Sequence, residues 1–301
     1  MQVSPQLVRG LTLANLAANV GIVITGGLVR LTGSGLGCPT WPKCTDDSYT
    51  PVGAVDVHKV IEFGNRMVSI IVGVVAIATV VALWRHPQRL LARWVLAGVL
   101  LQGVVGGITV RMDLSPYFVG PHFLLSMTLI ALAYQLWRRT NPSSAPTEPR
   151  LRPLGWAVTI AGAAVVVVGV VVTGSGPHSG DEKAVRTGLD PEMISQLHVD
   201  VVFLLLGLTV ATFLAAHGLR AWGVRRSATV LCGVLLAQGA IGFVQYFTHL
   251  PWVLVGFHVA GACAVWVATL GLLRSTGTAQ VGRTDAPARR AQDDALAQVG
   301  S

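Results

Sequence analysis

Residues 11–29 read LTLANLAANVGIVITGGLV, a run of 19 residues without a charged side chain. A helix of about 20 such residues crosses the hydrocarbon core of a bilayer. The run is too long for the apolar part of a signal peptide, only Arg9 supplies positive charge before it, and no small-residue cleavage site follows. We therefore expect a retained transmembrane helix at the start of the chain.

The rest of the chain has the same character. Of its 301 residues, 52% are hydrophobic and 12% are charged, whereas soluble domains carry about 25% charged residues. The net charge of +8 does not indicate a nucleic-acid partner, because Lys and Arg are spread over short loops between apolar blocks. The composition predicts an all-α integral membrane protein embedded in the lipid bilayer, with no nucleic-acid partner.

Apolar blocks of membrane-spanning length number eight, which predicts eight transmembrane helices. They cover residues 11–30, 61–84, 94–110, 120–137, 154–173, 197–217, 228–248 and 254–273. The termini and the loops on their side of the membrane hold 15 Lys and Arg residues but only four Asp and Glu residues. The other side holds seven Lys and Arg residues and ten Asp and Glu residues. Because cytoplasmic loops collect positive charge, we expect both termini in the cytoplasm of a bacterial cell, with the protein in its plasma (inner) membrane.

An internal repeat divides the chain into halves of four helices. The sequence Thr-Gly-Ser-Gly occurs at 32–35 and again at 173–176, and Gln102-Gly103 recurs as Gln238-Gly239. An even number of helices per repeat gives both halves one orientation, related by a pseudo-twofold axis along the membrane normal. The expected divisions are an N-terminal half 1–140, a cytoplasmic linker 141–153, a C-terminal half 154–273 and a disordered cytoplasmic tail 274–301.

Four of the eight histidines lie at the outer ends of the even-numbered helices: His58, His122, His198 and His258. His258 follows His122 by 136 residues, which is also the separation between Gln102 and Gln238. Histidines at such ends can simply mark the membrane interface. Neutral imidazole is also an iron ligand, and a haem between two facing helices takes one histidine from each. Two haem sites are the stronger interpretation, and a zinc site lacks clustered Cys and His.

Other polar groups gather on the same side. Glu62 lies one helical turn inward from His58, and Arg66 follows one turn later. Intramembrane ionisable groups are usually functional, although a structural ion pair is the alternative. Arg30 closes the first helix and suits a carboxylate such as a haem propionate. Cys38 and Cys44 lie in the first outer loop, where a disulfide is expected, with free or transiently redox-active thiols as the alternative.

The stretch GGLVRLTGSGLGCPTWPKC at residues 26–44 resembles the first-loop signature of the haem A synthase family, and the resemblance extends over about residues 10–273. It implies an oxidoreductase that converts haem O to haem A for terminal oxidase assembly. A porphyrin methyl is hydroxylated twice, and loss of water leaves a formyl group. The resemblance also implies a haem b cofactor in the C-terminal half and the substrate haem in the N-terminal half. A haem O synthase, oxidase assembly factors and quinol or another membrane electron donor are the implied partners.

Carried over to this chain, the resemblance makes His198 and His258 the ligands of haem b and places the substrate iron at His122. Glu62 matches the required glutamate, with Arg66 and Arg30 beside the substrate, and Cys38 and Cys44 match the loop pair that acts in redox chemistry or haem delivery.

Two departures from the family pattern matter. Many members have histidine where this chain has Asn65, and the second cysteine pair of some members is missing from loop 174–196. Asparagine is a poor iron ligand, and His58 lies two turns away on nearly the same helix face. The substrate iron therefore takes either His122 with His58, or His122 alone.

Two other functions fit parts of the pattern. A membrane cytochrome with two histidine ligands would relay electrons from quinol without modifying any haem, and Glu62 would then be dispensable. A repeat-built transporter would carry polar groups near the membrane midplane, whereas the polar groups here crowd the outer ends. The enzyme is the leading interpretation.

Overall fold

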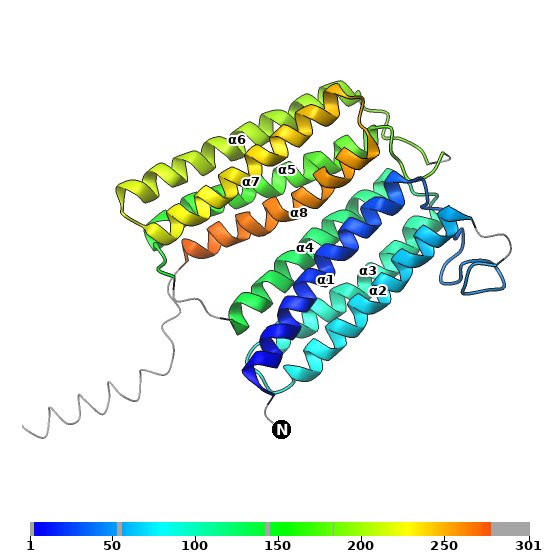
Figure 1. Ribbon diagram of the computed structural model, residues 1–301, viewed down its shortest axis with the longest axis horizontal. Coiled ribbons are helices and arrows are strands. Elements are labelled where there is room, and N and C mark those ends of the chain that lie inside the picture. The colour runs from blue at the N-terminus through cyan, green and yellow to red at the C-terminus, as the bar shows by residue number, and fades with distance from the viewer. Residues whose placement is uncertain (1–2, 53–55, 142–144, 183, 278–301) are drawn as a thin grey trace, which may run out of the picture.

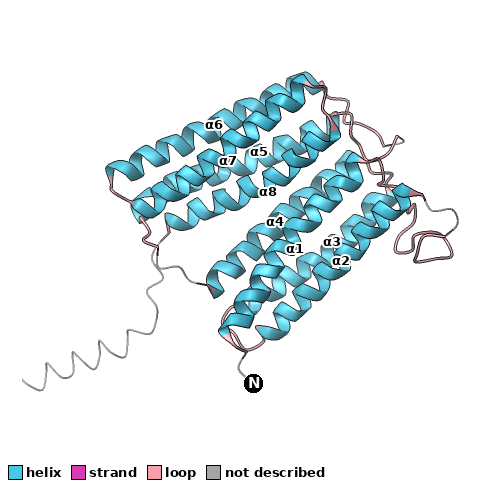
Figure 2. Ribbon diagram, in the orientation of Figure 1, coloured by secondary structure: helices cyan, strands magenta, loops and turns pink. Residues whose placement is uncertain are grey.

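The computed structural model describes residues 3–52, 56–141, 145–182 and 184–277. Eight helices in these ranges are long and apolar enough to cross a membrane (Figures 1 and 2), and the described residues include no strand. The all-α membrane fold is thereby confirmed. The helices are α1 Pro5–Leu31, α2 Val57–Ala82, α3 Arg89–Arg111, α4 Pro116–Thr140, α5 Arg152–Ser175, α6 Pro191–Gly218, α7 Trp222–Phe247 and α8 Trp252–Ser275, with a short 3₁₀ turn at Pro149–Leu151.

The helices are longer than the apolar blocks that predicted them. At the start of α2 the side chain of Asp56 accepts a hydrogen bond from the His58 amide, and Asp190 does the same for Glu192 at the start of α6. Such capping satisfies amides that the first turn leaves unpaired, so polar residues extend each helix beyond the lipid. His58 consequently lies within α2, whereas the apolar block began at residue 61.

Helices α1 to α4 contact one another in sequence and close through α1 and α4, and α5 to α8 close in the same way through α5 and α8. The two groups meet along α1, α4, α5 and α8 (Figure 1). Leu16, Met127, Ile130, Cys263 and Leu270 form a buried cluster across this contact. The pseudo-twofold relation and the domain boundaries stay predictions, and most of the predicted tail lies outside the described residues.

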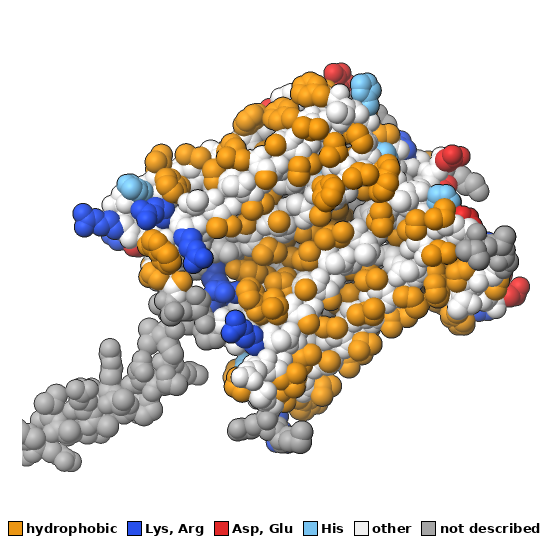
Figure 3. All heavy atoms as spheres, viewed as in Figure 1, with side chains coloured by type: hydrophobic (Ala, Val, Ile, Leu, Met, Phe, Trp, Pro, Cys, Tyr) orange, Lys and Arg blue, Asp and Glu red, His pale blue; other side chains and the backbone are white. Residues whose placement is uncertain are grey.

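The surface matches a lipid environment. Large apolar side chains such as Ile70, Leu100 and Leu214 are exposed along the helices, and apolar side chains cover the sides of the bundle in Figure 3. In the same view Lys and Arg gather at one end and acidic residues at the other. This is the charge asymmetry that the loops predicted, now seen in three dimensions.

Candidate functional site

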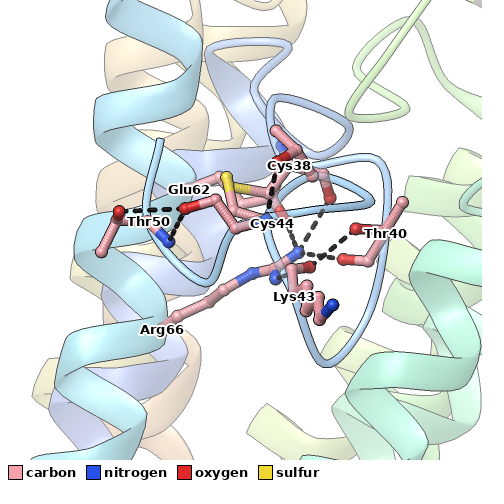
Figure 4. Close-up of a disulfide and its surroundings, with 9 residues drawn as sticks. Cys38, Thr40, Lys43, Cys44, Thr50, Glu62 and Arg66 are labelled. Atoms are coloured by element: carbon pink, nitrogen blue, oxygen red, sulfur yellow. Dashed lines mark hydrogen bonds and ion pairs between the residues drawn. A yellow bond between two sulfur atoms is a disulfide. The ribbon is translucent and has the colours of Figure 1, made fainter. Parts of the chain in front are cut away.

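Cys38 and Cys44 form a disulfide, which closes residues 38–44, hereafter the disulfide loop, over the outer end of α2. Both cysteines are fully buried. The buried side chain of Glu62 lies directly beneath them, and its Oε2 accepts a hydrogen bond from the Cys38 amide at 2.6 Å (Figure 4). The predicted disulfide and the predicted intramembrane glutamate therefore belong to one contact.

Arg66 joins Glu62 to the same loop. Its Nη2 donates to Glu62 Oε1 at 2.6 Å, so the two residues form the ion pair that was the structural alternative for them. The guanidinium also donates to three loop carbonyls, those of Cys38 at 2.8 Å, Thr40 at 3.0 Å and Lys43 at 3.0 Å (Figure 4). A planar group with five donors suits this convergence of acceptors. Two side chains of α2, Glu62 and Arg66, thus bond to the disulfide loop.

The disulfide loop also covers α3. The Trp41 ring lies against Gly107 so closely that a methyl group on this glycine would collide with the indole. Arg111 Nη2 donates to the Trp41 carbonyl at 2.8 Å. The neighbouring glycine, Gly106, contacts the imidazole of His122. Adjacent residues of α3 therefore place the loop indole and a predicted iron ligand at one depth, an association that sequence spacing did not reveal.

In the C-terminal half the two predicted ligands face each other. The rings of His198 and His258 have centroids 6.4 Å apart, with their planes at 69°. Each ring lies against a glycine of the preceding helix, Gly169 and Gly242 respectively. With metal–imidazole bonds of about 2 Å, two imidazoles on opposite sides of one iron have ring centres about 6 Å apart. The observed separation fits this arrangement.

The N-terminal half lacks such a ring pair among its described residues. His58 is exposed, and its Nδ1 lies 3.0 Å from the Ser34 hydroxyl in the outer Gly-rich turn. Asn65 Oδ1 accepts a hydrogen bond from Thr25 at 2.7 Å, on the side of α1. Of the residues predicted to surround the substrate iron, His122 alone has a partly buried imidazole.

The chemistry of these histidines fits an iron ligand. The Nδ1 atoms of His122 and His258 are buried, and each has no hydrogen-bond partner in the described part of the chain. A buried polar atom without a partner costs about 1–3 kcal/mol, and a ligating imidazole typically gains a partner or a metal at its ring nitrogens. Both rings are accommodated by glycines that leave no side chain in the way.

Hydrogen bonds that we call the polar seam join the two halves at the end of the bundle that carries the disulfide loop. Arg30 donates from Nε to the His178 carbonyl at 2.7 Å and from Nη2 to the Thr173 carbonyl at 2.6 Å. The Gly35 amide donates to the Gly180 carbonyl at 2.9 Å. The backbone carbonyl of His178 is part of this seam. The propionate contacts expected of Arg30 and Arg66 stay predictions.

Comparison with known proteins gives one consistent result. A family model described as "Cytochrome oxidase assembly protein" matches residues 9–270. A "Heme A synthase" of Rhizobium etli (strain CIAT 652) is 26% identical over 309 residues, covering 81% of this chain and 83% of the relative.

Shorter matches agree with this one. A "Heme A synthase" of Geobacillus thermodenitrificans is 32% identical over 121 residues, covering 38% of this chain and 37% of the relative. Because the family model spans nearly all of the eight-helix region that carries the disulfide loop and the outer histidines, this chain belongs to the cytochrome oxidase assembly protein family.

Proposed function

We propose that this protein is a membrane oxidoreductase that converts haem O to haem A. The relatives named "Heme A synthase" cover most of the chain. The observation that carries the proposal is the facing pair His198 and His258, at the spacing of iron ligands. The pair lies toward the same end of the bundle as the buried Glu62, because His198 contacts Gly169, one turn from the Thr173 carbonyl that accepts a hydrogen bond from Arg30. One porphyrin methyl is hydroxylated twice, and loss of water leaves the formyl group.

The C-terminal half would hold the cofactor. We propose that His198 and His258 would hold the iron of a haem b, which would supply one-electron redox chemistry when bound. Gly169 and Gly242 allow α5 and α7 to approach these rings closely. This closeness fixes the imidazoles against rigid helices, as a redox site requires.

The N-terminal half would bind the substrate. His122 is the iron ligand we assign there, because its ring is partly buried and its Nδ1 has no partner among the described residues. His58 and Asn65 already contact Ser34 and Thr25. This favours an iron held by His122 alone, which suits a haem that must enter and leave. Arg30 and Arg66 would contact its propionates through guanidinium N–H groups.

Glu62 is the residue we assign to the chemistry. Arg66 and the Cys38 amide each donate to one of its carboxylate oxygens, which fixes the position of the carboxylate. A carboxylate held in place stabilises positive charge that develops on the substrate, and its remaining lone pairs can accept a proton. The disulfide loop would fix this carboxylate during turnover.

The proposed orientation places both termini in the cytoplasm and both haem sites near the outer face. The clustering of Lys and Arg at one end of the bundle supports it (Figure 3). A haem O synthase in the same membrane would supply the substrate, and terminal oxidase assembly would consume the product. Quinol or another membrane electron donor would supply the electrons that the hydroxylations consume.

The test is haem extraction from cells that co-express this chain with a haem O synthase. Haem A should accumulate only when the chain is present. The competing function, a cytochrome that relays electrons, predicts an intact haem spectrum in the purified protein and an extract that contains haem O but no haem A. Haem O without haem A, at a normal level of folded protein, would therefore refute the enzyme.

A further inference from the structure

The segment Gln-Gly-x-x-Gly occurs twice, as QGVVG at residues 102–106 of α3 and as QGAIG at 238–242 of α7. The glutamine and the final glycine are four residues apart, so they lie on one helix face. In both halves this face is turned toward the histidine of the following helix. The proposed function gives neither glutamine a role.

Each glutamine binds the backbone of a histidine. Gln102 Nε2 donates to the His122 carbonyl at 2.9 Å, and Gln238 Nε2 donates to the His258 carbonyl at 2.8 Å. The two bonds join residues 20 apart in sequence in both halves. A buried amide is costly within a membrane helix unless its groups are bonded, so a repeated bond to the same residue points to a specific use.

Each final glycine receives the ring of that histidine. A Cβ atom on Gly106 would lie 3.2 Å from His122 Cε1, and a Cβ atom on Gly242 would lie 3.4 Å from His258 Cε1. The same stretch of helix therefore contacts the histidine at two points, the carbonyl through glutamine and the imidazole through glycine. Two contacts restrict both the sliding of the helices and the rotation of the ring.

The surroundings of the two glutamines differ. Gln102 also contacts the Ser126 hydroxyl, whereas Gln238 lies in a notch at Gly261, where an added methyl group would collide with its amide. The two halves thus hold the amide by different local means and still direct it to the same carbonyl. The feature that both halves share is the bond to the histidine.

We infer that Gln102 and Gln238 are positioning residues that fix the imidazoles of His122 and His258 for iron ligation. The inference rests on the proposed function, which makes these histidines ligands. A ligand whose supporting contacts are removed typically loses about 10- to 100-fold in metal affinity. Loss of the glutamine hydrogen bond leaves the helix and the imidazole free to shift. Haem should therefore dissociate faster while the fold persists.

The test measures haem loss from the purified full-length protein to excess apomyoglobin. Gln238→Leu should start with the wild-type low-spin spectrum and then lose the C-terminal haem about 10- to 100-fold faster. Its low-spin EPR signal should also broaden, because the imidazole orientation varies. Gln245→Leu is the matched control, since it removes a glutamine from the same helix that bonds to no histidine. It should lose haem at the wild-type rate.

Gly261→Ala disturbs the same contact without altering the glutamine, and it keeps the test decisive if Gln238→Leu folds poorly. It should accelerate haem loss, and the double variant should be no faster than Gln238→Leu, because two changes to one contact are not additive. Additive effects, or a wild-type rate in either single variant, would overturn the inference. His258→Ala separates the two proposals: if it retains low-spin haem, the ligand assignment itself fails.

Discussion

Arg66→Met should open the disulfide loop. Three of the hydrogen bonds from Arg66 join α2 to loop carbonyls, and a bond to a charged group contributes about 1.5–3 kcal/mol. The Arg66 side chain is 19% exposed, so water replaces part of each contact. Discounting the sum to about one third leaves about 1.5–3 kcal/mol, which corresponds to about a 10- to 150-fold change in an opening equilibrium.

Reduction of the disulfide measures this opening. Cys38 and Cys44 are fully buried, so a thiol reductant reaches them only when the loop opens. The assay follows alkylation of the released thiols by mass spectrometry at a fixed reductant concentration. Arg66→Met should be reduced about 10- to 150-fold faster than the wild type.

Arg111→Met is the control for that experiment. Arg111 donates a single exposed bond to the same loop, at the Trp41 carbonyl, so its loss should accelerate reduction by only about threefold or less. Reduction of Arg66→Met within about threefold of the wild type would refute the reasoning. An equal effect of Arg111→Met would also refute it, because general loosening of the loop would then explain both.

Three further outcomes are expected. Glu62→Gln should retain the spectrum of the C-terminal haem while haem A production falls at least tenfold, since the amide cannot act as a base. Near-normal haem A production would mean that Glu62 serves only as the ion-pair partner of Arg66. His198→Ala should abolish the low-spin spectrum of the purified protein, and a normal spectrum would defeat the ligand assignment. Gly107→Ala should lower the melting temperature, because the added methyl group would overpack the Trp41 indole and destabilise the fold by about 1–3 kcal/mol. Gly103→Ala is the control and should not lower it, since the space at its Cβ position is open. Equal melting temperatures of the two variants would count against the contact between Trp41 and Gly107.

The topology is also testable. A reporter that is active only outside the cytoplasm, fused after Ser301, should stay silent, and activity would place the C-terminus outside.

Periodicity and composition were sufficient for the fold class. Helices such as α5, with an apolar run of valines, have to satisfy their backbone hydrogen bonds internally in lipid, so length and hydropathy identify them. Their ends were predicted less well, because an apolar block marks the lipid-buried segment and caps such as Asp56 extend the helix beyond it. The disulfide was predictable because two cysteines lie close together in a single outer loop.

The sequence by itself determined the helices, the repeat and the residue types at the outer ends, because these follow from local composition and spacing. The family resemblance implied the pair His198 and His258, and the tertiary structure added the separation of their rings, 6.4 Å. Only the tertiary structure decided the contacts of the arginines: it directed Arg30 to the other half and turned Arg66 toward the disulfide loop. Contacts of this kind depend on how helices rotate and slide against one another. That rotation is set by packing, including glycines that allow a ring or an indole to approach, and a linear pattern does not specify it.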